Sequence, residues 1–160
     1  MNNRQKSKTS NTFFSENQAI TAGLEQELKN VSNIKSFLTK YKKHMISQTL
    51  SEHLTQLLVE KEKSIADVVH DSFLDRTYVY QIFSGKRTPS RDKLISIAFG
   101  LHLSADETQK LLKISGNRKL YVKDERDAII LFSIHNNQVV GQTNFLLIDN
   151  GFTPLEGPVR

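Results

Sequence analysis

The sequence predicts an all-α protein, and three observations carry this prediction. Apolar residues recur at intervals of three and four along most of the chain, which is the period of an amphipathic helix. Serine, threonine and aspartate stand just before these segments, where the first amides of a helix need acceptors. No segment alternates apolar and polar residues as a half-buried strand would. The expected architecture is a bundle of short helices.

The composition of the 160-residue chain excludes several classes of protein. There is no cysteine, so the chain holds neither a disulfide framework nor a thiolate site. No stretch reaches the ~18 consecutive apolar residues of a membrane span, and the N-terminus lacks the apolar run of a secretory signal. We therefore expect a cytoplasmic protein with no membrane partner. The net charge of +5 suits a nucleic-acid partner.

The N-terminal part divides into a tail and a helical extension. Residues 1–14 are polar and basic, which predicts a disordered tail. The extension covers residues 15–48, and Gly23 is expected to weaken its first helix. Apolar residues in it follow a nearly heptad spacing, at Leu24, Leu28, Val31, Ile34, Leu38, Tyr41 and Met45. This extension either packs on the rest of the chain or associates with a second copy or a partner.

Five short helices are predicted between residues 49 and 116. Each begins after a residue whose side chain can accept from a helix amide, and three of these residues have Glu or Asp three positions later, as in a capping box. An apolar stripe follows each start. The expected capping residues are Thr49, Ser64, Asp75, Ser90 and Ser104.

Beyond Gly116 the chain adds a helical pair over residues 117–151 and a tail over residues 152–160. After a connector, one helix is expected over residues 124–135 and another over residues 138–149. Both are too apolar to remain uncovered. They either cap the five-helix bundle or form a dimer interface.

The segment from Ser64 to Arg87 carries a more specific pattern. It contains two short helices joined by a tight turn, and Gly85 closes the second helix 21 residues after Ser64. Together with Thr88-Pro89-Ser90 and the apolar helix that follows, it resembles the helix-turn-helix of Xre-type, lambda-repressor-like DNA-binding proteins. The resemblance covers residues 49–114. It implies a five-helix lambda-repressor-like DNA-binding domain with extra helices at both ends.

One residue departs from the pattern of that family. The turn between its two signature helices commonly holds glycine, and here Phe73 stands at that position. A positive φ suits glycine and is costly for phenylalanine. We therefore expect the turn to differ in detail or to be strained.

The resemblance implies that the helix over residues 76–84 enters the major groove. Its outer face is polar and free of carboxylates, as contact with base edges requires. The expected base contacts are Arg76, Thr77, Tyr80 and Gln81. The expected contacts to the DNA backbone are Ser64, Ser84, Lys86, Arg87 and Ser90. Tyr78 is either a core residue or a phosphate contact, and Arg91 and Lys93 are expected to add positive charge beside the phosphates.

These features predict a sequence-specific transcriptional regulator, such as a repressor, whose partner is double-stranded DNA. As an alternative to a disordered tail, residues 1–14 would then form a basic arm that follows the DNA backbone or enters a minor groove. The rival interpretation is a helical protein-interaction adaptor that uses the same fold without binding DNA. A homodimer formed through residues 24–45 or 124–149 and a separate protein partner both stay open.

No enzymatic chemistry is predicted. The five histidines are scattered without metal-ligand spacing, and His70 with Asp71 is expected to be a turn-facing or solvated pair. The seven glycines lie singly, with no phosphate-binding loop. Glu60 and Glu62 are expected to be solvated on a lysine-rich face. We expect no catalytic residue, no metal and no cofactor.

Overall fold

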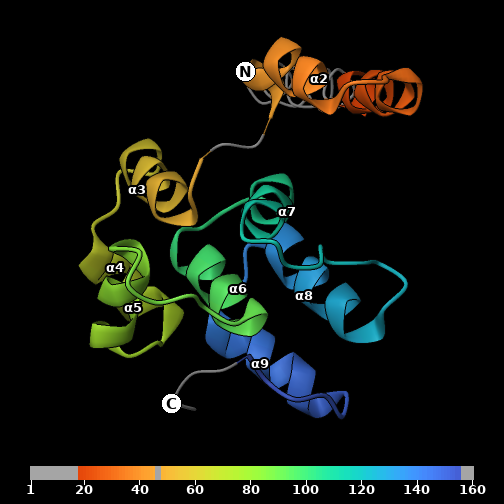
Figure 1. The fold of residues 1–160 in the computed structure, drawn as a ribbon. Helices are drawn as coiled ribbons and strands as arrows, with labels where there is room; N and C mark the ends of the chain where they lie inside the picture. The colour runs from red at the N-terminus through yellow and green to blue at the C-terminus, as the bar shows by residue number, and fades with distance from the viewer. Residues whose placement is uncertain (1–17, 46–47, 156–160) are drawn as a thin grey trace, which may run out of the picture. The chain divides into compact units, whose positions relative to one another are not determined.

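The computed structural model describes residues 18–45 and 48–155, and all the regular secondary structure in them is helical. The all-α prediction is confirmed for this part of the chain (Figure 1). Contacts divide the chain after Ile46 into unit 1, residues 1–46, and unit 2, residues 47–160. The predicted tail over residues 1–14 and the last five residues lie outside the described ranges. Within those ranges no helix is long and apolar enough to cross a membrane.

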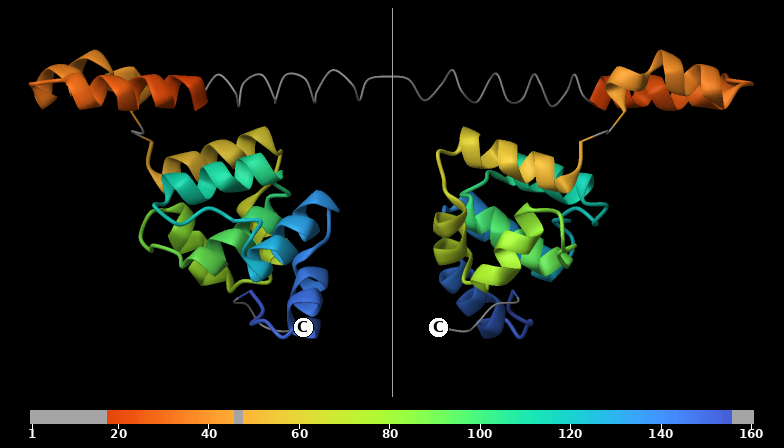
Figure 2. Two further views of the ribbon diagram at one scale, coloured as in Figure 1. Left: turned by 90° about the vertical axis from the view of Figure 1, so that its right-hand side faces the viewer. Right: turned by 60° about the vertical axis from the view of Figure 1, so that its left-hand side comes forward.

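Unit 1 contains a helical hairpin. Residues 18–30 are helical, and α2 (Ile34–Lys40) and the short 3-10 helix η1 (Lys42–His44) follow. Glu27 on the first helix accepts from Lys40 at 3.3 Å and from the Tyr41 hydroxyl, so the two helices run side by side (Figure 2). The helix passes through Gly23 without a break. The break falls at residues 31–33, where the Asn33 side chain accepts from the amide of Lys35 and starts α2.

Unit 2 begins with the five helices that the capping residues predict. All five predicted caps are confirmed, because each side chain accepts from an amide of the helix that it starts. The capping boxes after Thr49, Ser64 and Ser104 are also present. Two further helices form the C-terminal pair. The helices of unit 2 are α3 (Leu50–Glu60), α4 (Ile65–Ser72), α5 (Arg76–Phe83), α6 (Arg91–Gly100), α7 (Ala105–Ile114), α8 (Glu125–His135) and α9 (Val140–Asp149).

Helix α6 lies at the centre of unit 2. Every residue from Leu94 to Gly100 is buried, and α6 contacts α4, α7 and α9 (Figure 1). Gly100 permits the close approach of α4, since a β-carbon at this position would lie 2.9 Å from the carbonyl oxygen of Val68. The apolar area buried around α6 is the main favourable term in the stability of unit 2.

The turn between α4 and α5 keeps the backbone that glycine would adopt. Phe73 has φ 61° and ψ 14°, in the left-handed region, so the expectation of a strained turn is confirmed. The Phe73 ring lies against α9, because a β-carbon on Gly141 would come within 3.3 Å of its Cε2 atom. Packing of this ring offsets part of the backbone strain and joins the turn to the C-terminal pair.

The sequence of α6 and α7 is repeated in α8 and α9. Residues 91–120 align with residues 126–155 without a gap, at an offset of 35 residues. The helix boundaries, the connecting turns and the closing glycines correspond. The identical pairs are Arg91 and Arg126, Asp92 and Asp127, Ile95 and Ile130, Thr108 and Thr143, Leu111 and Leu146, Leu112 and Leu147, Gly116 and Gly151, and Leu120 and Leu155.

The two repeats also share their backbone geometry and hydrogen bonds. Near the ends of α6 and α8 the backbone takes positive φ, 55° at His102 and 52° at Asn137. Arg91 donates to the carbonyl groups of residues 118 and 119, and Arg126 donates to those of residues 153 and 154. Helix α6 contacts α9, and α7 contacts α8. Each repeat contacts the other in the same way, which is the pattern of a two-fold pseudosymmetric pair.

Candidate nucleic-acid interface

Helix α5 turns one apolar face inwards and one polar face to solvent. Its start is fixed by Asp75, whose carboxylate accepts from the amide of Tyr78 at 3.0 Å. Val79, Ile82 and Phe83 are buried in the core of unit 2. At the other end the Ser51 hydroxyl of α3 donates to the carbonyl oxygen of Phe83. The helix is therefore anchored at both ends, with its polar face outward.

The four residues predicted to contact bases share this outward face. Arg76, Thr77 and Tyr80 are exposed, and Gln81 is half-buried. The Arg76 guanidinium lies 5.2 Å from the centre of the Tyr80 ring, and its Nη2 is 3.5 Å from the Tyr80 hydroxyl. This contact holds the arginine along the helix surface. Among the ion pairs between described residues, none involves Arg76.

The residues predicted to contact the DNA backbone have two different roles. Lys86 and Arg87 are exposed cations directly after α5, and their amides donate to the carbonyl oxygen of Gln81 at 2.9 and 3.2 Å. Gly85 adopts φ 80° to make this turn. The serines have structural roles, because the hydroxyls of Ser64 and Ser90 cap α4 and α6, and the hydroxyl of Ser84 donates to Gln81 at 3.1 Å.

The ring of Tyr78 contacts two of the cations beside α5. The Arg87 guanidinium lies 5.2 Å from the centre of its ring, and the Lys93 ammonium lies 3.9 Å from it. Both distances are in the range of cation–π attraction. The half-buried ring therefore positions positive charge on the flank of α5.

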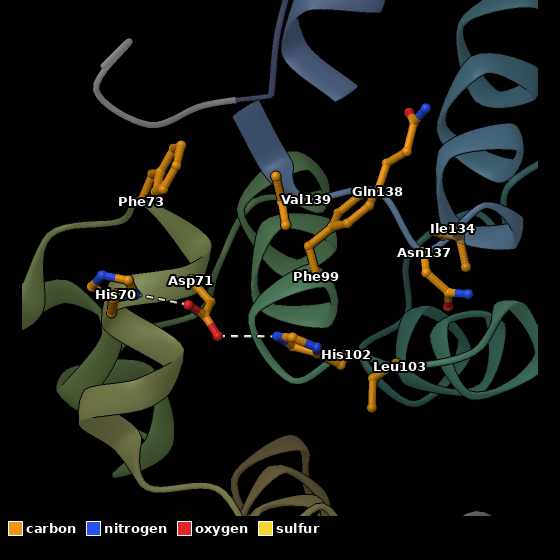
Figure 3. Close-up of a pocket in the computed structure, with 10 residues that line it drawn as sticks. All are labelled: His70, Asp71, Phe73, Phe99, His102, Leu103, Ile134, Asn137, Gln138 and Val139. Atoms are coloured by element: carbon orange, nitrogen blue, oxygen red, sulfur yellow. Dashed lines mark hydrogen bonds and ion pairs between the residues drawn. The ribbon is translucent and has the colours of Figure 1, made fainter. Parts of the chain in front are cut away.

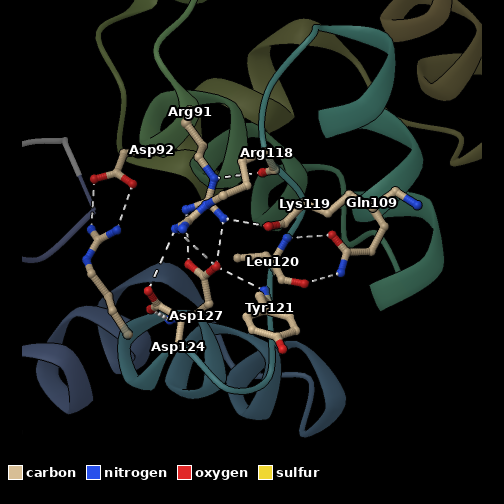
Figure 4. A network of polar contacts seen from close by, with 10 residues as sticks. Arg91, Asp92, Gln109, Arg118, Lys119, Leu120, Tyr121, Asp124 and Asp127 are labelled. Atoms are coloured by element: carbon tan, nitrogen blue, oxygen red, sulfur yellow. Dashed lines mark hydrogen bonds and ion pairs between the residues drawn. The ribbon is translucent and has the colours of Figure 1, made fainter.

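Arg91, which was expected to add positive charge beside the phosphates, is held in an ion pair with Asp127. Its guanidinium donates to both carboxylate oxygens of Asp127, at 3.0 and 2.8 Å (Figure 4). It also donates to the carbonyl oxygens of Arg118 and Lys119 at 2.8 and 3.0 Å. Asp92, the acid nearest to it in sequence, is paired with Arg126.

Asp127 is ionised in this network although it is buried. Burial alone would raise the pKa of its carboxyl group. Hydrogen bonds from Arg91 and from the amide of Tyr121 outweigh the burial, so the pKa lies below its ordinary value. The pair therefore joins α6 to α8 as a charged contact at neutral pH.

A hollow of about 280 Å³ lies behind the turn between α4 and α5 (Figure 3). Asp71 stands at its edge and accepts from His70 at 2.8 Å and His102 at 3.0 Å. His70 is exposed, as predicted for a solvated pair. Within the described ranges no group of three or more His, Cys, Asp or Glu residues is placed to hold a metal ion. The hollow is lined by His70, Asp71, Phe73, Phe99, His102, Leu103, Ile134, Asn137, Gln138 and Val139.

The side chains with the clearest functional arrangement thus gather on and beside α5. We call this set the α5 surface, and it consists of Arg76, Thr77, Tyr80, Gln81, Lys86, Arg87 and Lys93. Lys93 is included because it contacts Tyr78, and Arg91 is left out of this set because its guanidinium is paired with Asp127. No protein-family model, curated protein or solved structure matches this chain.

Proposed function

We propose that this protein is a sequence-specific DNA-binding transcriptional regulator of the cytoplasm. In this proposal α4 and α5 form a helix-turn-helix within a lambda-repressor-like domain of α3 to α7, and α5 lies in the major groove. The observation that carries the proposal is the α5 surface, a polar helix face flanked by the exposed cations Lys86 and Arg87. Those cations would neutralise phosphates, and the face beside them would read base edges.

Each side chain of the outward face has a chemical role in this proposal. The planar fork of Arg76 matches the O6 and N7 acceptors of guanine, and the amide of Gln81 matches N6 and N7 of adenine. Thr77 would contact a base or a phosphate. Tyr80 would hold Arg76 in place and offer its hydroxyl to a phosphate or its ring to a thymine methyl group. The Arg76–Tyr80 contact reduces the side-chain freedom that binding would otherwise have to remove.

The test is fluorescence anisotropy with the full chain, on duplexes selected from a random pool and on random duplexes. Arg76→Ala should lose the preference for the selected sequences, at about 1–3 kcal/mol. Lys86→Ala should weaken binding to all sequences alike and flatten the salt dependence. Lys123→Ala removes an exposed lysine outside the α5 surface and serves as the control. Equal, uniform losses for Arg76→Ala and Lys86→Ala would refute the groove assignment.

A second candidate is a helical protein-interaction adaptor. The observation in its favour is apolar surface on the C-terminal pair, where Phe132, Phe145 and Ile148 are 53%, 69% and 52% exposed. Weak binding to DNA that ignores both sequence and the Arg76→Ala change would favour this candidate. Loss of binding to a protein partner on Phe145→Ser would then test it directly.

A further inference from the structure

The helical hairpin of unit 1 leaves most of its apolar side chains exposed or half-buried. Phe37 is its buried apolar residue among those described, at 6% exposed. Chains of fewer than about 40 residues usually need disulfides, a metal or association to be stable. The chain has no cysteine, and its described part holds no group suited to a metal. Exposure reaches 36–53% at Ile20, Leu28, Val31, Ile34 and Leu38.

These exposed residues form one stripe along each helix. Ile20 and Leu28, with the half-buried Leu24 between them, are spaced four apart on the first helix, and Ile34 and Leu38 are spaced four apart on α2, while Val31 lies between the two helices. Residues four apart lie on the same face of a helix. Phe37 and Tyr41 pack with their ring centres 5.0 Å apart, and Tyr41 donates to Glu27 on the first helix. The hairpin is thus fixed from within, while no described part of the hairpin itself covers its two stripes.

The two helices carry opposite charge, which indicates what covers the stripes. The helix over residues 18–30 holds Glu25, Glu27 and Lys29, whereas residues 34–45 hold four lysines and no acid. Glu27 is already paired with Lys40 of its own hairpin. A second copy related by a two-fold axis can pack with Glu25 of one hairpin beside the lysines of the other that have no such pair among the described residues, Lys35, Lys42 and Lys43. Opposite charges in this arrangement favour the pairing and fix its register.

The C-terminal pair is a weaker candidate for a dimer interface than the hairpin. Its inward face is already occupied, because α8–α9 and α6–α7 cover each other through reciprocal ion pairs, Arg91 with Asp127 and Arg126 with Asp92. Reciprocal contacts of this kind close on themselves and leave no equivalent surface for a third helical pair. Phe145 and Ile148 lie outside this closed contact.

We propose that residues 18–45 form a homodimerisation element, in which two hairpins pack their apolar stripes into a four-helix bundle. This interaction does not depend on the α5 surface. If the chain also binds DNA, the dimer supplies two copies of α5 and therefore two half-sites.

The first test is the mass of the full chain in solution by sedimentation equilibrium over nanomolar to micromolar concentration. The wild-type chain should reach twice its 18.3 kDa mass. Ile34→Gln combined with Leu38→Gln should raise the dimer dissociation constant at least tenfold, whereas Phe145→Gln combined with Ile148→Gln should leave it unchanged. A monomer at all concentrations, or a dimer lost only in the second variant, would overturn the proposal.

A second measurement covers the case in which the double variant unfolds the hairpin. Because the chain has no cysteine, Leu38→Cys introduces a single thiol in the stripe, and Ser36→Cys introduces one on the opposite face of α2. As the protein concentration rises and dimers form, the rate of thiol modification should decrease for Leu38→Cys and stay constant for Ser36→Cys. A Leu38→Cys rate that does not depend on concentration would overturn the proposal. Neither readout involves DNA, so this inference and the proposed function fail independently.

Discussion

The guanidinium of Arg91 donates two hydrogen bonds to the carboxylate of Asp127, at 3.0 and 2.8 Å. This contact joins α6 of the first repeat to α8 of the second. Asp127 is 1% exposed, so this contact lies almost out of water. Its counterpart pairs Arg126 with Asp92 at 2.9 and 2.8 Å. The adjacent residues Arg91 and Asp92 thus bind an acid and an arginine of α8, respectively. Together they fix the C-terminal pair on the start of α6.

Removal of one partner of this pair should cost stability. Asp127→Ala leaves the Arg91 guanidinium without its carboxylate and removes an acceptor from the amide of Tyr121, so we expect a loss of about 3 kcal/mol in the free energy of unfolding. Urea denaturation followed by circular dichroism measures it. Asp149→Ala, an exposed acid at the end of α9, is the control and should change little. A loss below 1 kcal/mol for Asp127→Ala would show that the pair is not a structural contact of this kind.

The same carboxyl group predicts a dependence of stability on pH. The pKa of Asp127 is lowered by folding from its ordinary value near 3.8, so its contribution is complete above that value and is lost as the pH falls through the lowered pKa. The free energy of unfolding should therefore decrease below about pH 4. In Asp127→Asn the decrease should be smaller. Asp71 and Glu107 have lowered pKa values too, so part of the acid sensitivity should persist in the variant.

The contact between α4 and α6 predicts that Gly100→Ala is destabilising. The added β-carbon would lie 2.9 Å from the Val68 carbonyl oxygen and 3.2 Å from the Ser72 β-carbon, and neither neighbour is the end of a flexible side chain. Overpacking of this kind costs about 1–3 kcal/mol. Gly23→Ala is the matched control, because nothing lies within 4 Å of a β-carbon there. An unchanged melting temperature for Gly100→Ala would show that α4 can shift at no cost.

Local features of this fold could be predicted from the sequence, and distant pairings could not. The five caps depend on residues within three positions of each other, so the pattern of Ser, Thr and Asp was sufficient. The partner of Arg91 is 36 residues away, and helical periodicity says nothing about it. The offset of 35 residues between the repeats is visible in the sequence, but only by comparing the chain with itself. That comparison would have shown that Arg91-Asp92 recurs as Arg126-Asp127, but not that each pair contacts the other.

At the candidate site, too, the local features could be predicted from the sequence and the contacts between separate segments could not. The outward face of α5 follows from helical spacing, and Arg76, Thr77 and Tyr80 are exposed as that spacing predicts. The grouping of Arg87 and Lys93 around Tyr78 depends on how the turn after α5 folds. Helix propensity pointed to Gly23 as the weak position, because glycine is a poor helix former. The break instead falls at residues 31–33, where the Asn33 cap starts a new helix.

The Phe73 turn predicts a measurable difference between two substitutions. Phe73→Ala keeps the cost of φ 61° and removes the ring that lies against Gly141, whereas Phe73→Gly removes both the ring and the strain. We therefore expect Phe73→Ala to be less stable than Phe73→Gly by about 1 kcal/mol. Urea denaturation of the two variants isolates the backbone term. Equal stabilities would mean that the turn relaxes once the ring is gone.

The Arg76 guanidinium predicts a difference between arginine and lysine that charge alone cannot explain. Arg76→Lys keeps the positive charge beside α5 but loses the planar fork that would pair with guanine and that packs on the Tyr80 ring. Affinity for the selected duplex should fall by about 1–3 kcal/mol, while affinity for random duplexes and its salt slope should stay the same. Arg87→Lys tests charge at the flank and should leave the preference intact, because phosphate contact tolerates either cation. If Arg76→Lys also keeps the full preference, Arg76 acts as a point charge, and the reading of bases must come from Thr77, Tyr80 or Gln81.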